Sequence, residues 1–550
     1  MKILNTKMIR KIFLILFIIP FFQACDKSAL DRQPNDQMTE LEAFEDLLVA
    51  DKFLNNVYAE LYGNLYNRTS NYLLASTTDE GDAANFTTGA YHFNMGSLSP
   101  MTNPLPNYWD IYYSAIRKAN IFLRNIDVVP GNAEQKERLK GEAQFLKAFF
   151  YQQIFKYYGQ FIIVDQVLTV TDDLELPKNS IEECVTYIKS LCDEAISKLP
   201  IAHDPSDLGR ATKGAAMALK AECLLFFASP LHNPTTNKDR WKNAADAAMA
   251  ILSNPEFEYK LHNNYQKLFL ENNNEEIIFA YMAGSSTNAM EAANGPSGYG
   301  GWCGLSPTQE MVDAYEMKNG VAPFLENGSI NPLSGYDAAN PYENRDPRFY
   351  ASILYNGANW QGRAVESFVN GKDGIAIGAH TRSQTGYFLK KFLDESLVLN
   401  GPQRRSATWN LFRLGMVMLD FAEARNEFSG PDNEVYAAVD AIRSRAGMPA
   451  LPEGLTQQEM RKKIHQERLI EGAFEDYRFW DVRRWKEGVA LFGKPIHGMR
   501  ITKIGNTLNY ERLQIKNRVF DDKRHLFPIP QSEVNKNKNP IQNPGWDLSN

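Results

Sequence analysis

The fold of this 550-residue chain is decided by two segments, YWDIYYSAIRKANIFLRNI (residues 108–126) and ERLKGEAQFLKAFFYQQIFKYY (residues 137–158). Each segment places apolar residues at steps of three and four, which predicts an amphipathic helix. The Gly131-Asn132 pair between them predicts a tight turn. The two helices are therefore expected to form a helical hairpin.

The same periodicity continues along the chain. It predicts further helices over residues 180–199, 212–228, 241–251, 410–428, 434–446 and 456–485. Alanines at regular steps, such as Ala215 and Ala218, let neighbouring helices approach closely. The chain is thus predicted to be mainly α, a tetratricopeptide-like helical-repeat superhelix, with a generic helical bundle as the alternative. Between residues 261 and 405, Gly, Asn, Pro and aromatic residues predict a loop-rich, ligand-binding region packed on these helices.

The amino terminus has the pattern of a lipoprotein signal. Four basic residues precede an apolar run over residues 12–22, which is too short to span a membrane comfortably. A small residue, Ala24, stands directly before Cys25. We expect residues 1–24 to be removed and Cys25 to carry the lipid, which would hold the protein on a membrane almost permanently. A plain secretory signal is the alternative.

Charge and motifs exclude several function classes. The chain carries a net charge of −7, and loss of residues 1–24 with their four basic groups leaves −11. Nucleic acid is therefore not an expected partner. The sequence has no HExxH, P-loop or GxSxG motif. A glycoside hydrolase needs only two suitably placed carboxylates, so its 66 acidic residues leave that alternative open. The remaining cysteines lack the close spacing of a metal or redox motif, and we expect buried thiols, with a disulfide possible: Cys184, Cys192, Cys223 and Cys303.

Charged residues in the second half predict ion pairs that hold the fold. Glu467, Glu471 and Glu475 fall at steps of four, as a carboxylate stripe on one helix. Ion pairs are favoured over a catalytic carboxylate pair at this place. The basic and acidic residues expected to take part are Arg468, Arg478, Arg483, Arg484, Arg345, Asp346 and Arg348.

Loop aromatics outside the helices are candidates for carbohydrate recognition. A sugar ring has one apolar face and a rim of hydroxyl groups, so it needs a flat aromatic face and planar polar groups. For each aromatic, a side chain tucked onto the scaffold is the alternative. An acidic group in the first candidate cluster, Asp79, Glu80 and Asp82, is a weak calcium candidate, because calcium takes several oxygen ligands. The predicted ligand contacts are Tyr66, Arg68, Tyr72 and Asp82 in one cluster, Tyr299 and Trp302 in a second, and Trp360 in a third.

Several segments resemble the SusD/RagB family, in the family's order along nearly the whole chain. They are LDRQP (30–34), GEAQFLKA (141–148), GRATKGAA (209–216), VDAYEMKNG (312–320), NRDPRF (344–349), IRSRAGMP (442–449), FEDYRFWDVRRW (474–485), LFPIP (526–530) and QNPGW (542–546). The resemblance implies an outer-membrane lipoprotein that faces the cell exterior and binds an oligosaccharide without turnover or cofactor. It also implies docking on a SusC-like TonB-dependent barrel.

The resemblance and the composition together predict the domain organisation. Residues 1–24 are the signal peptide and 25–40 the lipid anchor and tether. Residues 41–260 form an N-terminal helical-repeat region, 261–405 the loop-rich region, and 406–550 the C-terminal helices and extended tail. Two other functions remain open at this point: a surface glycoside hydrolase, and a peptide-binding or purely structural repeat scaffold.

Overall fold

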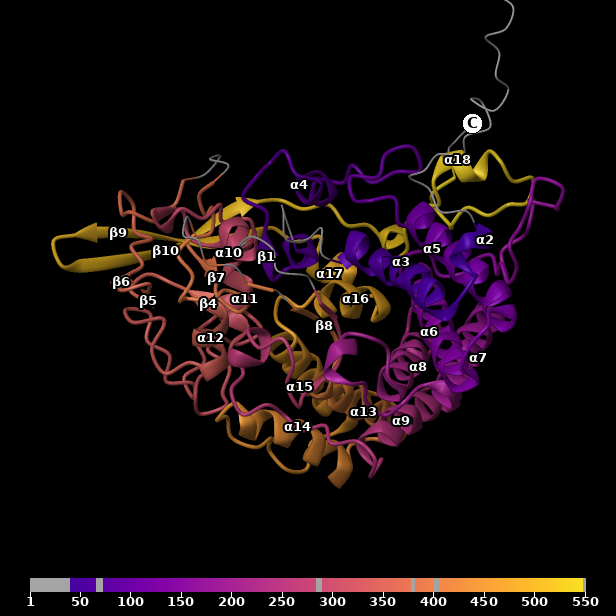
Figure 1. The fold of residues 1–550 in the computed structure, drawn as a ribbon. Coiled ribbons are helices and arrows are strands. Elements are labelled where there is room, and N and C mark those ends of the chain that lie inside the picture. The colour runs from indigo at the N-terminus through magenta and orange to yellow at the C-terminus, as the bar shows by residue number, and fades with distance from the viewer. Residues whose placement is uncertain are drawn as a thin grey trace, which may run out of the picture.

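A computed structural model describes residues 40–65, 73–282, 289–376, 381–399, 403, 405–406 and 408–547. Its first half is a curved layer of helices in which, apart from α4, each packs against the next along the chain (Figure 1). Asn132, Ser180 and Thr212 each cap the helix that follows them, and Ser180 does so in a capping box. The helices of this part are α2 (Glu40–Ala43), α3 (Leu47–Leu65), α4 (Gly89–Asn94), α5 (Tyr108–Asn125), α6 (Ala133–Tyr158), α7 (Ile181–Lys198), α8 (Lys213–Ala228) and α9 (Lys238–Leu252).

Helix α6 is the centre of this layer. Every residue from Gly141 to Tyr158 is buried, so the helix is covered on all sides rather than along one stripe. It packs against α5 and α7, as the predicted hairpin requires. The helical prediction is confirmed, and the fold is mainly α.

The C-terminal helices α13 (Leu414–Ser429), α14 (Asn433–Arg445) and α15 (Gln457–Glu471) extend the same layer. Helix α13 packs on α8 and α9, although more than 150 residues separate them in the sequence. One hydrophobic core contains Phe149, Leu419 and Phe527 together. The two helical parts of the chain thus share a core, and the predicted domain boundaries stay a prediction.

Two predicted helix boundaries are wrong. The helix expected from residue 410 begins at Leu414, because residues before it form strand β8 (Thr408–Arg413), which pairs antiparallel with β2 (Ile277–Met282). The helix expected over 456–485 breaks after Glu471 and resumes as α16 (Tyr477–Arg484). Phe474 and Asp476, with φ of 63° and 72°, take left-handed backbone conformations in the break.

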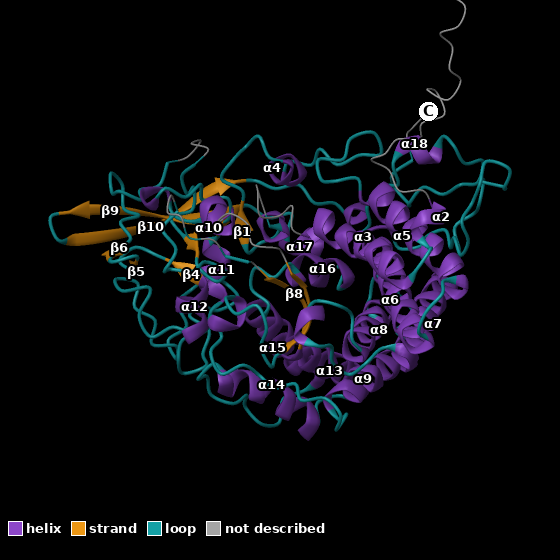
Figure 2. Cartoon of the chain, viewed as in Figure 1, coloured by secondary structure: helices purple, strands orange, loops and turns teal. Residues whose placement is uncertain are grey.

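Short strands and long loops build the other side of the molecule, to the left of α5–α9 in Figure 2. They enclose a second hydrophobic cluster that includes Leu305, Tyr315, Phe349 and Tyr387. A long hairpin formed by residues 496–516 projects from this side. The sequence predicted only an extended tail there. The elements are β1 (Gly81–Asp82) paired with β3 (Ser306–Pro307), β4 (Ile353–Leu354) with β7 (Phe388–Leu389), β5 (Asn359–Trp360) with β6 (Arg363–Ala364), β9 (Ile496–Ile504) with β10 (Thr507–Lys516), and helices α10 (Ala289–Asn294), α11 (Gln309–Ala314), α12 (Pro347–Ser352), α17 (Gly488–Leu491) and α18 (Gln531–Val534).

A buried ion cluster joins the loops to the helices, as predicted. Arg413 is fully buried and pairs with Glu276 at 2.8 Å, Glu471 at 2.7 Å and Glu475 at 2.8 Å. Arg348 pairs with Glu471 from the other side, at 3.1 Å. The break after α15 therefore brings Glu475 to Arg413 by a turn, not by a continued helix. Arg468, Arg478 and Arg484 also form the expected pairs with acids.

Two arginines do not form the ion pairs predicted for them. Arg483 is buried against aromatic rings, with its guanidinium 3.6 Å from the centroid of Phe479, and no described acidic residue pairs with it. Burial lowers the pKa of Arg483 to about 9. Arg345 donates instead to the backbone carbonyl oxygens of Pro341 and Val312. Both side chains are surrounded by backbone and rings, and among the described residues no carboxylate forms an ion pair with either of them.

The described part of the chain contains no helix with the length and apolarity needed to cross a bilayer. The four cysteines within it are buried free thiols, as expected: Cys184, Cys192, Cys223 and Cys303.

Candidate functional site

The predicted contacts divide into those the structure places and those it does not. Cys25, Tyr66, Arg68 and Tyr72 lie outside the described residues. The second and third clusters are described completely. The loop after α10, which carries Tyr299 and Trp302, contacts the hairpin β5–β6, which carries Trp360.

The loop over residues 295–305 holds Trp302 in a fixed, exposed position. Its backbone bonds back to α10, with the Trp302 amide donating to Ala292 O at 2.9 Å and the Cys303 amide to Gly295 O at 3.1 Å. A Cβ atom on Gly301 would lie 2.1 Å from Gly295 O, so only glycine fits there. Gly301 and Cys303 are buried, whereas 57% of Trp302 is exposed. The indole is thus presented to solvent by a tightly bonded backbone.

Tyr299 lies three residues before Trp302 in the same loop, and its ring stacks on the neighbouring hairpin. The Arg363 guanidinium is 3.7 Å from the Tyr299 ring centroid, and the tyrosine hydroxyl donates to Arg363 O at 3.2 Å. Burial raises the pKa of Tyr299 to about 12, so the phenol is neutral at physiological pH. Tyr299, Trp302 and Arg363 are called the aromatic platform below.

A buried aspartate joins the two halves of the platform. Asp373 accepts two hydrogen bonds from Arg363, at 2.7 and 3.1 Å, and one from the Gly298 amide at 3.1 Å. Such a two-point arginine–carboxylate contact fixes the plane of the guanidinium. Asp373 therefore positions Arg363 against the Tyr299 ring.

Trp360 does not contribute a ligand contact. Only 3% of it is exposed, and it packs in the second hydrophobic cluster. It lies on β5 directly before the turn at Gln361 and Gly362, whose positive φ values of 45° and 81° suit a tight hairpin turn. Trp360 thus anchors the hairpin that carries Arg363.

Asp82 is likewise buried, and pairs with Lys516 at 2.8 Å and Arg518 at 3.3 Å. Strand β1, which contains Asp82, pairs with β3, and β3 begins four residues after Trp302. The structure therefore brings the end of the first predicted cluster close to the second. Asp82 takes part as a structural ion pair and not as a ligand contact.

The calcium candidates have protein partners. Asp79 accepts from Arg478 at 2.7 and 2.9 Å, and the fully buried Glu80 accepts from the Phe474 amide at 2.7 Å. Burial raises the pKa of Glu80 to about 8, which favours the uncharged acid and opposes a cation ligand role. Nowhere in the described ranges do three His, Cys, Asp or Glu residues converge as a metal site.

The platform matches the chemistry of a sugar ring. An exposed indole face covers the apolar face of a pyranose, and a guanidinium donates to its hydroxyl groups. Sequence reasoning missed Arg363 and Asp373, because they lie more than 60 residues from Trp302 and carry no local pattern. The glycines around Trp302 were the available signal.

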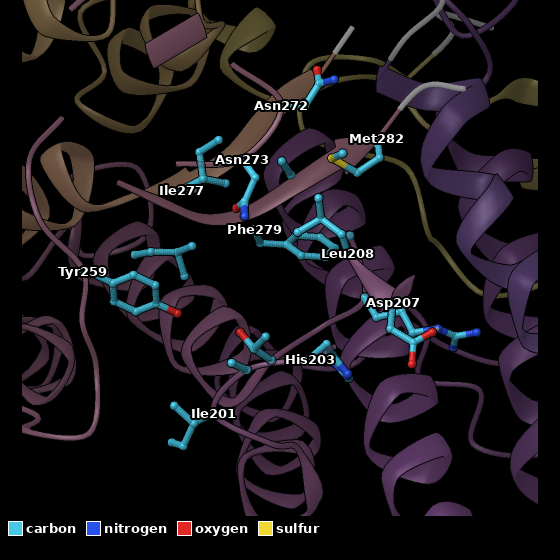
Figure 3. A pocket seen from close by; sticks show the side chains of 16 residues that line it. Ile201, His203, Asp207, Leu208, Tyr259, Asn272, Asn273, Ile277, Phe279 and Met282 are labelled. Atoms are coloured by element: carbon cyan, nitrogen blue, oxygen red, sulfur yellow. The ribbon is translucent and has the colours of Figure 1, made fainter. Parts of the chain in front are cut away.

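A separate hollow lies between the loop before α8 and strand β2 (Figure 3). Its volume is about 200 Å³, and its lining is largely apolar, with Leu208, Ile277 and Phe279 pointing into it. Arg210 at its edge is engaged by Glu142 at 2.8 Å. No residue of the aromatic platform lines this hollow.

Comparison with known proteins agrees with the described fold. A family model described as "SusD family" matches residues 260–546, and one described as "Starch-binding associating with outer membrane" matches residues 30–225. The chain is similar to SusD-like protein P2 of Formosa agariphila, with 24% identity over 474 residues and 83% of each chain covered.

Solved structures have the same architecture. A SusD-like protein from Bacteroides fragilis superposes with a TM-score of 0.79 at 29% identity, covering 94% of this chain and all of that one. A structure named a SusD-like carbohydrate-binding protein, also from B. fragilis, gives a TM-score of 0.76 at 24% identity, with 90% and 99% covered. The SusD family model alone spans more than half of the sequence. The chain therefore belongs to the SusD family.

Proposed function

We propose that this protein is a cell-surface glycan-binding protein. Anchored in the outer membrane through Cys25, it captures an oligosaccharide on the aromatic platform and delivers it to a SusC-like TonB-dependent transporter. The observation that carries the proposal is Trp302, a large aromatic side chain held 57% exposed by a rigid loop. An exposed aromatic that the backbone holds in place loses little conformational entropy when a ligand covers it.

Membership in the family supports the ligand class and the location. One of the two matching family models is described as starch-binding and associated with the outer membrane, and a similar structure is named carbohydrate-binding. SusD-like binding proteins are non-catalytic, so the proposal includes binding and release but no bond cleavage. Asp373, the carboxylate that contacts Arg363, is buried, which agrees with a structural role.

Affinity electrophoresis tests the ligand class. The mature protein is run through gels containing laminarin, starch, xylan, mannan or mucin glycans, and we expect retardation in at least one of them. The same mixtures are assayed for new reducing ends, and none is expected. New reducing ends would indicate a hydrolase. No retardation by any polysaccharide would leave the peptide-binding or structural scaffold as the function.

Fractionation and co-purification test the anchor and the partner. Cys25→Ser is expected to release the protein from the outer membrane into a soluble fraction, because the thiol is the predicted lipid attachment point. A tagged wild-type protein is expected to co-purify with a TonB-dependent barrel from detergent-solubilised outer membrane. Retention of Cys25→Ser in the membrane, or the absence of a barrel, would contradict the corresponding part of the proposal.

A further inference from the structure

A second cavity, larger than the hollow of Figure 3, lies among the helices. It has a volume of about 470 Å³, within the range of small-ligand pockets, and is called the inter-helix cavity below. It is bounded by α9, α13 and α15, by the loop between α8 and α9, and by the residues that follow α16. In Figure 1 these helices meet far from α10, which precedes the platform loop. Its main lining residues are Trp241, Glu427, Gln457, Arg461, His465 and Glu487.

One wall of the cavity is a stacked pair of rings. His465 lies parallel to Trp485, with ring centroids 3.5 Å apart and planes 8° apart. Burial lowers the pKa of His465 to about 3, so its imidazole is uncharged at physiological pH. An uncharged imidazole has one nitrogen that donates and one that accepts. The wall is therefore flat, neutral and able to hydrogen-bond at its edge.

Several polar groups in the wall have unused hydrogen-bonding capacity. Among the described residues, neither ring nitrogen of His465 forms a hydrogen bond, and the nearest acid, Glu487, is 4.0 Å away. No described residue accepts a hydrogen bond from the Trp241 indole N–H. Arg461 uses only two of its nitrogens, which donate to Glu427 at 2.6 and 2.5 Å. Polar groups that converge on a cavity without partners are suited to bind a ligand or water.

The acidic side chains next to these polar groups are largely neutralised by their own partners. Glu423 accepts from Arg484 at 2.5 and 2.6 Å and from the Trp485 indole at 2.8 Å. Glu427 is paired with Arg461, and burial raises the pKa of Glu487, which disfavours its charged form. The remaining charged lining residue, Lys238, is opposite in sign to Glu487, so the cavity has little net charge to attract an ion. It suits an uncharged ligand that has one apolar face and many donors and acceptors.

We propose that the inter-helix cavity is a second carbohydrate site, which takes one neutral sugar residue with its ring against His465. Its hydroxyl groups bond to the Trp241 indole, Arg461 and Glu487. The sequence places Gln457, Arg461 and His465 at steps of four on α15, so one helix face supplies three of the lining residues. This site goes beyond the aromatic platform, because it accepts a single residue between helices and not a chain across a surface.

Titration with neutral monosaccharides tests the proposal on the full mature chain. Glucose, galactose, mannose and xylose are added separately to millimolar concentrations, and binding is followed by saturation-transfer NMR and tryptophan fluorescence. We expect at least one sugar to saturate. His465→Ala should weaken its binding about tenfold, since it removes the ring against which the sugar lies. Lys242→Ala, an exposed change on the same α9 helix as Trp241, is the matched control and should have no effect.

Further variants separate this site from the platform. Trp302→Ala should leave monosaccharide binding unchanged. Arg461→Gln changes a partly exposed side chain and should weaken it, which provides a second measurement if His465→Ala does not fold. The inference is overturned if no monosaccharide saturates, or if Trp302→Ala abolishes binding while His465→Ala retains it. Failure of the aromatic platform to bind glycan is measured independently, as an absence of retardation in the polysaccharide gels.

Discussion

Replacement of Trp302 by alanine is the most direct test of the aromatic platform. A tryptophan side chain contributes roughly 150–250 Å² of contact area, and about 57% of Trp302 is exposed. A sugar ring on one indole face would cover about half of that exposed area, roughly 60 Å². At about 25 cal/mol per Å², this contact is worth ~1.5 kcal/mol. The expected result is a Kd increase of about tenfold for the retained glycan.

Isothermal titration calorimetry with that glycan measures the change, and thermal unfolding measures the stability. Because the indole is mostly exposed and its loop is held by backbone bonds, Trp302→Ala should alter the free energy of unfolding by less than about 0.5 kcal/mol. Leu333→Ala, at a side chain that is 78% exposed elsewhere, should change neither quantity. Trp360→Ala should instead lower stability by roughly 3–5 kcal/mol, because it removes a buried ring. An unchanged Kd for Trp302→Ala, at unchanged stability, would refute the platform as the glycan site.

Three other predictions concern the groups around this site and the buried charges. Arg363→Ala should weaken glycan binding several-fold by calorimetry, and Arg363→Lys should restore only part of it, because lysine lacks the planar guanidinium that Asp373 orients. Arg413→Met should lower the free energy of unfolding by about 3–5 kcal/mol in denaturant titration. The substitution removes a buried cation that pairs with three buried carboxylates. Glu80→Gln should flatten the pH dependence of the melting temperature. Folding raises the pKa of Glu80 from 4.5 to about 8, so its contribution to wild-type stability is present below the first value and lost as pH rises through the second.

The helices were predictable because their signal is local. In an α-helix, residues three and four apart share a face, so the apolar pattern of residues 137–158 already specifies α6. Ion pairs such as Arg468 with Asp481 were also expected from the density of opposite charges. Errors arose where a long-range contact overrode the local pattern. Strand β8 forms in place of a first helical turn because β2 is available to pair with it.

The sequence by itself determined the helical class, the family resemblance, and the glycine-rich setting that marks Trp302 for exposure. Only the tertiary structure decided that Trp360 is buried, that Asp82 pairs with Lys516, and that Arg363 covers Tyr299. The exposure of a side chain, and stacking such as that of Arg363 on Tyr299, depend on how segments more than 60 residues apart pack against one another. No repeat of three, four or two residues along the chain encodes such contacts, because they arise from the shape of the whole packed molecule.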